Sequence, residues 1–176
     1  MSNPYSTPDQ QGPVQPTLDR VQAVRGLKII TFAMVMSVLV FMGVALAINK
    51  GAIDGEPEIM SWIGIGMAGL MIVNHVVLPN VVAKAASNKV NAEEFRAADE
   101  ATKFLLVFPA FQTRHIVASA MLEGAAFMNL VFYMMTEYVG NIAAAAVLVV
   151  LLALRFPTVS AAEFWVQDRT REIELG

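Results

Sequence analysis

Residues 116–135 read IVASAMLEGAAFMNLVFYMM, an apolar run that is interrupted by a single charged residue, Glu123. The hydrocarbon core of a bilayer is about 30 Å thick, and a helix needs about 20 mainly apolar residues to cross it. Three further apolar runs of similar length occur in the chain. The four predicted spans cover residues 27–48, 60–82, 114–135 and 138–156. The sequence therefore predicts an all-α integral membrane protein with four transmembrane helices in a bundle.

The overall composition supports this fold class. Hydrophobic residues make up 56% of the chain and charged residues 15%, whereas soluble domains are usually about a quarter charged. The chain has no cysteine, which excludes disulfides and thiolate metal sites. The formal net charge of -3 and the lack of a basic stripe argue against nucleic acid as a partner. The expected partner is the lipid bilayer.

The distribution of cations predicts the orientation. Eleven of the 12 lysine and arginine residues lie on one side of the predicted spans, and Lys50 alone lies on the other. The positive-inside rule then places both termini and the central loop in the cytoplasm. The membrane is expected to be the bacterial cytoplasmic (inner) membrane. An alternative is that residues 27–48 are a cleaved signal peptide, because Ala45-Leu46-Ala47 has the small residues of a cleavage site.

Both ends of the chain are expected to lie outside the membrane. Residues 1–25 are predicted to be a disordered cytoplasmic tail, because prolines and polar residues there cannot bury enough apolar surface to offset the entropy of ordering. Residues 26–158 form the four-span membrane domain. Residues 159–176 are predicted to form a short amphipathic cytoplasmic tail.

Local signals refine the predicted tail. Ser160 and Glu163 have the spacing of a capping box at a helix start. Trp165 and Ile173 fall on one stripe of that helix, which is expected to face the membrane surface.

The loop between the second and third spans is predicted to contain a short helix that Asn91 caps. Pro109 is expected to end or kink the next helical segment, and the apolar residues 104–111 are expected to lie along the membrane interface. A continuous helix through this segment and the third span would be about 48 Å long, which is too long for one crossing.

Glu123 is the main candidate functional residue. Placing an ionised carboxylate in the middle of a bilayer costs roughly 3 kcal/mol on insertion scales, and keeping it neutral at pH 7 costs a comparable amount. His75 in the second span and Glu123 in the third lie at similar predicted depths, about 12 and 13.5 Å from the inner ends of their antiparallel spans. The two side chains are therefore expected to form a pair, with Ser119, one turn before Glu123, as a hydrogen-bonding neighbour.

Glycines in the second and third spans are expected to serve helix packing. Gly64, Gly66 and Gly69 spell the letters of a dinucleotide-binding fingerprint, but that site requires a strand before the glycines and an exposed helix end. A hydrophobic span provides neither. Small residues instead let the backbones of neighbouring helices approach, which is the role predicted for these glycines and for Gly124.

The sequences WIGIGMAG at 62–69 and QTRHIVASAMLEGAAFMNLVFYMM at 112–135 together resemble the two-helix hairpin of the rotary ATP synthase proteolipid, subunit c. The resemblance implies that a glycine-rich helix packs against a helix whose ion-binding carboxylate is Glu123. The connecting loop is longer here and lacks the Arg-Gln-Pro signature of that family.

Residues 62–165 also look similar to a family of small uncharacterised bacterial four-helix membrane proteins. The likeness is carried by the third-span sequence Leu122-Glu123-Gly124 and by Phe156-Pro157-Thr158 after the fourth span. This resemblance implies a fold and no activity.

Taken together, the residues predict a structural or accessory membrane subunit, in a homo-oligomer or a larger membrane complex. No catalytic residues, metal site or cofactor are predicted, because no nucleophile, metal cluster or paired carboxylates converge in the spans. The alternative is a proton- or cation-handling subunit that uses Glu123 with His75.

Overall fold

The computed structural model describes residues 16–88 and 90–175, and it is built from helices. In chain order the helices are α1 (Pro16–Ile48), α2 (Ile59–Ser87), α3 (Ala92–Ala97), α4 (Glu100–Thr136), α5 (Val139–Leu154) and α6 (Val159–Leu175). No strand occurs within these two ranges, where an isolated bridge joins Asp54 and Tyr138. The predicted all-α fold is therefore confirmed.

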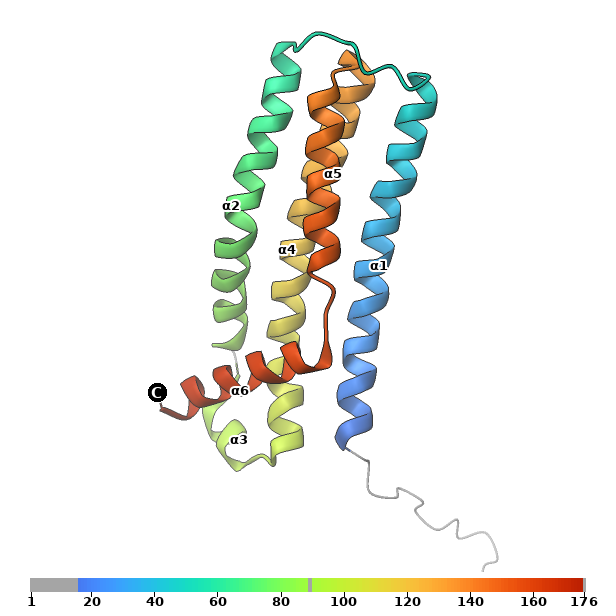
Figure 1. Ribbon diagram of the computed structural model, residues 1–176. Helices are drawn as coiled ribbons and strands as arrows, with labels where there is room; N and C mark the ends of the chain where they lie inside the picture. Colours follow the sequence, from blue (N-terminus) through green and yellow to red (C-terminus); the bar gives the residue numbers. More distant parts are fainter. Residues whose placement is uncertain (1–15, 89, 176) are drawn as a thin grey trace, which may run out of the picture.

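The four apolar helices α1, α2, α4 and α5 run side by side, and α3 and α6 lie together at one end (Figure 1). That end is here called the base, and the opposite end, with the α1–α2 loop and the α4–α5 turn, the apex. α5 packs against α4 between α1 and α2, around a core of Val38, Leu122, Leu130, Leu148 and Leu152. α4 is therefore the central helix of the bundle.

The helices α1, α2 and α4 are each long and apolar enough to cross a membrane. A fourth crossing requires α5 and α6 to count as one broken span, because these two helices meet at 73°. The 16 residues of α5 extend about 24 Å, less than the bilayer core of about 30 Å. The predicted spans lie in α1, α2, α4 and α5, but the last of them is shorter than expected.

The predicted break at Pro109 is wrong. α4 runs without interruption over 37 residues, which corresponds to about 56 Å. Pro109 lies on the exposed side of the helix, where its ring does not enter the core, and α4 continues through it.

Residues 104–111, in the basal part of α4, pack against other helices of the protein. The sequence predicted instead that they lie along the membrane interface. The buried aromatic residues Phe104, Phe108 and Phe111 of α4 form a second core with Val24 and Leu27 of α1, Phe95 of α3, and Ala162 and Val166 of α6. The buried residues of 104–111 thus have protein neighbours that remove them from water, while Leu105 remains exposed. The helix therefore does not need to turn along the membrane surface.

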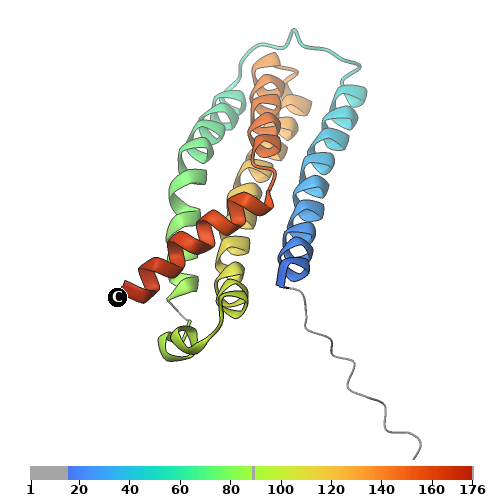
Figure 2. The same ribbon diagram turned by 60° about the horizontal axis from the view of Figure 1, so that its bottom comes forward.

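The helix predicted for the tail is present as α6, but its apolar stripe faces the protein. α6 runs from α1 across the basal part of α4 toward α2 (Figure 2). The ring of Trp165 lies 5.7 Å from that of Phe111, and Ile173 is packed against the second core. α6 begins at Val159, and the hydroxyl of Thr158 accepts the N–H of Ala161, so Thr158 caps the helix and the predicted capping box at Ser160 is wrong.

Side-chain hydrogen bonds cap the first turns of α3 and α4. Asn91 accepts the N–H of Glu93 and caps α3, as predicted. Asp99 caps α4 by accepting the N–H of Thr102, and hydrogen bonds from the side chain and N–H of Thr102 hold the pKa of Asp99 below its ordinary value.

α1 begins at Pro16, so the boundary predicted at residue 25 for the disordered tail is wrong. Proline suits the first position of a helix because its missing N–H would have no partner there in any case. The remaining part of that predicted tail, residues 1–15, lies outside the described residues.

Candidate functional site

The predicted contact between His75 and Glu123 is wrong. Glu123 is turned toward α1, where its Oε1 atom lies 2.7 Å from the Ser37 hydroxyl. His75 remains on α2, where Nδ1 contacts the carbonyl of Ile72 in its own helix. The predicted match in depth is also wrong: Asn129 lies beside Gly64 and Arg114 beside Asn80, so Glu123 is level with about residue 70 of α2, roughly 7.5 Å from the level of His75. Depth alone, moreover, does not specify which face of α4 a residue occupies.

The rotation of α4 explains the error. Asn129, on the face of α4 that contacts α2, donates to the carbonyl of Gly64 at 2.9 Å. Glu123 precedes Asn129 by six residues, which at about 100° per residue turns it about 120° away around the helix axis. Glu123 therefore faces α1, and its side chain does not contact His75 on α2.

Ser119 does not bond Glu123 either, contrary to the prediction. Its side chain is fully buried, and its hydroxyl has no hydrogen-bond partner among the described residues. A buried hydroxyl without a partner loses its hydration without compensation. The residue that sequence reasoning missed is Ser37, whose position near the middle of the first apolar run was the available signal.

The Ser37 hydroxyl lies 2.7 Å from two acceptor atoms, Oε1 of Glu123 and the carbonyl oxygen of Met34. A serine hydroxyl has one hydrogen and two lone pairs. Both contacts are satisfied together when Ser37 donates to Met34 and a protonated Glu123 donates to Ser37. An ionised Glu123 would instead accept the hydrogen bond of the Ser37 hydroxyl. The Met34 carbonyl would then lose Ser37 as a donor.

A second polar cluster joins α2, α4 and α5 near the apex. Asn129 bonds Gly64, and Asn141 of α5 donates to the Ser61 carbonyl and to Asn129 Oδ1, both at 3.2 Å. The Ser61 hydroxyl donates to Thr136 at 3.1 Å. Asn129 is thus an interhelical donor, and Asn141, which sequence reasoning missed, is the single amide of the fourth predicted span.

Of the four glycines predicted to serve helix packing, Gly64 is the one in close contact within the chain. A Cβ atom there would lie 2.7 Å from the ring of Phe132 and 2.8 Å from the amide of Asn141. A Cβ at Gly66, Gly69 or Gly124 would meet no atom within 4 Å. For these three glycines the predicted packing within the chain is wrong, because they lie on exposed faces.

Gly124 instead borders an apolar groove between α2 and α4 with a volume of about 480 Å³. The side chains that line it are almost entirely apolar, and four of them are methionines. The lining residues are Met67, Met71, Val117, Ala120, Met121, Gly124, Ala125 and Met128.

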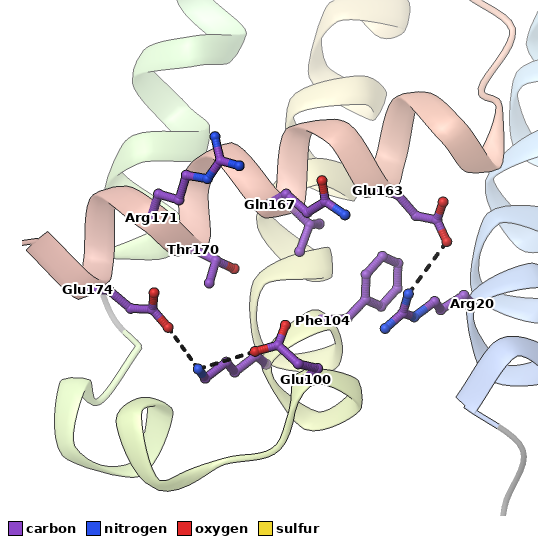
Figure 3. A pocket seen from close by; sticks show the side chains of 10 residues that line it. Arg20, Glu100, Phe104, Glu163, Gln167, Thr170, Arg171 and Glu174 are labelled. Atoms are coloured by element: carbon purple, nitrogen blue, oxygen red, sulfur yellow. Dashed lines mark hydrogen bonds and ion pairs between the residues drawn. The ribbon is translucent and has the colours of Figure 1, made fainter.

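Charged side chains gather at the base, around a cleft of about 280 Å³ between α6 and the start of α4 (Figure 3). Glu163 of α6 pairs with Arg20 of α1 at 3.5 Å, and Lys103 of α4 pairs with Glu174 of α6 at 2.7 Å. The Arg20 guanidinium also lies over the Phe104 ring, 5.1 Å from its centroid. These contacts attach α6 to α1 and α4.

Polar side chains also meet where α1, α2 and α4 approach the base. The Thr31 hydroxyl lies 2.9 Å from Nε2 of the buried His115, and Arg114 donates from Nε to Asn80 at 2.6 Å. No group of three His, Cys, Asp or Glu side chains that could hold a metal ion occurs in residues 16–88 and 90–175.

Comparisons of the chain with protein-family models, with curated proteins and with solved structures find no match. The likeness to the proteolipid hairpin and to small bacterial four-helix proteins therefore stays a prediction from residues alone. The site has to be interpreted from its own geometry.

Proposed function

We propose that this protein is an accessory subunit of a larger assembly in the bacterial cytoplasmic membrane, with its base in the cytoplasm. The orientation is supported by the cations of residues 16–88 and 90–175, of which ten lie toward the base and Lys50 alone toward the apex. The apolar helices α1, α2 and α4 support the membrane location.

The observation that carries this proposal is the use made of the polar groups at membrane depth. Asn129 and Asn141 connect α2, α4 and α5, while Glu123 meets Ser37 between α4 and α1. Each of these contacts joins two helices of the same chain. They favour a structural role, in which hydrogen bonds hold helices together where no hydrophobic effect drives their association.

The groove between α2 and α4 supports assembly with another protein. We infer that its occupant is one apolar transmembrane helix of a partner subunit. Gly124 and Ala120 leave room for a neighbouring backbone, as small residues do at membrane helix interfaces. The four methionines of the lining provide flexible side chains that adapt to a partner surface.

Filling the groove tests the assembly. Gly124→Trp places a large side chain at its edge, whereas Gly43→Trp places one on an exposed part of α1 that also has open space around the glycine. Wild type and Gly43→Trp should migrate on native gels in mild detergent as a species larger than the monomer, and Gly124→Trp as the monomer. A larger species that survives Gly124→Trp, or a monomeric wild type, would reject the proposal. Mass spectrometry of the larger species then separates a partner subunit from a second copy.

A second candidate function is proton handling by Glu123 with Ser37 in place of His75. The arrangement around Ser37 favours this function, because two acceptors lie within reach of its single hydrogen. When Glu123 gains or loses its proton, the serine hydroxyl needs only to rotate from one acceptor to the other. Glu123 is also only partly buried, so the carboxyl group is not sealed inside the bundle.

Liposomes that contain a pH-sensitive dye test this second function. Wild-type protein should speed the decay of an imposed pH gradient, Glu123→Gln should abolish that effect, and Glu137→Gln on the exposed apical turn should retain it. Equal decay with Glu123→Gln would leave the carboxyl group with a structural role.

A further inference from the structure

Arg114 and Arg155 differ from the other arginines at the base. Both are partly buried, and no carboxylate lies within 4.0 Å of either in the part of the chain that the structure describes. By contrast, Arg20 pairs with Glu163 and Arg169 pairs with Glu172. Arginine stays charged at all physiological pH values, and a buried charge is costly unless an opposite charge accompanies it.

The two guanidinium groups belong to one site. They lie at the same level of two neighbouring antiparallel helices, because Asn129 of α4 contacts Asn141 of α5, and Arg114 and Arg155 each follow about 21 to 22 Å further toward the base. Arg114 also adjoins the buried His115 in the chain. Asn80 on α2 accepts from Nε of Arg114 and so fixes that side chain, while Thr31 on α1 fixes His115. Polar side chains from α1, α2 and α4 and from the end of α5 thus lie at this level of the bundle.

One nitrogen of this site has no partner. Nε of Arg155 is inaccessible to water and makes no hydrogen bond to any residue in 16–88 or 90–175. A buried donor without an acceptor costs free energy, and such a group calls for an explanation by an unseen ligand or ion. An external acceptor reaches this nitrogen only when the Arg155 side chain turns outward, whereas the two partly exposed charges call for a negatively charged partner at the surface of the bundle.

The level of the site in the bundle identifies the source of such an acceptor. Arg114 lies about 33 Å from Thr136 along α4, close to the thickness of the bilayer core of about 30 Å. Arg155 follows α5 about 24 Å from its apical start, and arginine side chains at helix ends extend to the membrane boundary. Both groups therefore lie at the depth of the lipid headgroups when the apex lies at the opposite boundary.

We propose that Arg114 and Arg155 bind the phosphate of an anionic phospholipid in the leaflet at the base. Guanidinium groups bind phosphate oxygens through paired, charge-assisted hydrogen bonds, and basic pockets between membrane helices bind anionic headgroups. A lipid with a net negative charge compensates the two arginines, whereas a zwitterionic lipid brings its own cation into the site. The proposal is independent of whether the protein assembles with other subunits.

A neighbouring hollow does not compensate these charges. It has a volume of about 220 Å³ and is lined in part by Asn80. Two carboxylates, Asp168 and Glu172, face two cations there, Lys84 and Arg169, so this hollow brings no net charge to the arginines.

Thermal unfolding of the purified protein in neutral detergent tests the proposal. Added phosphatidylglycerol should raise the midpoint by about 3 to 5 °C more than the same amount of phosphatidylcholine, as expected for a ligand present well above its Kd. Arg114→Gln combined with Arg155→Gln should remove this difference. Arg25→Gln combined with Arg171→Gln makes the same change in charge at two exposed arginines and should retain it.

Three outcomes would overturn the proposal. The first is a difference between lipids that persists in the Arg114 and Arg155 double variant, and the second is its equal loss in the Arg25 and Arg171 control. The third is full stabilisation by inorganic phosphate alone, which would make the site one for a soluble anion. If the double variant does not fold, native mass spectrometry of the wild type decides, because the proposal requires retention of phosphatidylglycerol in preference to phosphatidylcholine.

Discussion

The apical and basal halves of the bundle are held together by different chemistry. Near the apex, the helices approach closely at Gly64 and are joined by neutral amides such as Asn129 and Asn141. At the base, aromatic side chains around Phe111 form the core, and ion pairs such as Arg20 with Glu163 attach α6. The apical half has the chemistry of a lipid environment, where close backbones and uncharged hydrogen bonds stabilise packing, and the basal half has that of a soluble domain.

The largest expected effect concerns the basal core. Phe111 is 5% exposed and contacts Phe108 and Trp165. Phe111→Ala should lower the free energy of unfolding by about 3 to 4 kcal/mol, because a buried aromatic ring is lost and a cavity remains. It should also make α6 more sensitive to limited proteolysis. Phe164→Ala, at a residue of α6 that is 75% exposed, is the control and should change neither measurement. Equal effects of both changes would mean that α6 is not docked through this core.

The next effect concerns the close approach at the apex. Gly64→Ala places a methyl group within 3 Å of Phe132, Asn129 and Asn141, and such overpacking costs about 1 to 3 kcal/mol. Gly66→Ala, two residues further along α2, meets open space and should be neutral or stabilising by up to about 1 kcal/mol. Unfolding in detergent measures both variants, and a tolerated Gly64→Ala would show that α2 and α4 are further apart than described.

A smaller effect is expected from the amide cluster. Asn129→Leu removes the donor to the Gly64 carbonyl and the acceptor for Asn141. The expected loss is about 1 kcal/mol, in the range measured for hydrogen bonds between membrane helices. Asn74→Leu is the control, since among residues 16–88 and 90–175 the Asn74 side chain bonds only the carbonyl of Leu70 in its own helix. A loss for Asn74→Leu as large as that for Asn129→Leu would remove the special role of the cluster.

The smallest effect distinguishes the two halves by their response to salt. Glu163→Gln breaks the pair with Arg20, which is partly exposed, and should cost at most about 1 kcal/mol at low ionic strength. That cost should disappear in 1 M salt, where screening acts within about 3 Å. The cost of Asn129→Leu should not change with salt, because no charge is involved. The same salt response in both variants would contradict the assignment of different chemistry to the two halves.

The sequence alone predicts the helices better than it predicts their neighbours. Runs such as residues 116–135 identify the apolar helices because length and hydrophobicity are properties of one segment. The pairing of His75 with Glu123 failed because it depends on the rotation of α4, which is set by packing at Gly64 and Asn129. Residues 104–111 were assigned to a lipid interface because apolar side chains have the same pattern whether lipid or protein covers them. The docking of Trp165 on Phe111 decides that question, and it lies in contacts between distant segments.

The continuous course of α4 has a mechanical consequence. At the apex, the carbonyls of Tyr133 and Glu137 accept hydrogen bonds from Asn49 and Gly55 of the α1–α2 loop, and at the other end Phe111 and Lys103 hold α6. One continuous helix of about 56 Å thus connects the apex and the base of the bundle. A tilt of about 5° about the apical end would displace the basal end by about 5 Å at this length. Membrane helices tilt in response to bilayer thickness. A change in thickness that tilts α4 would therefore also move α6.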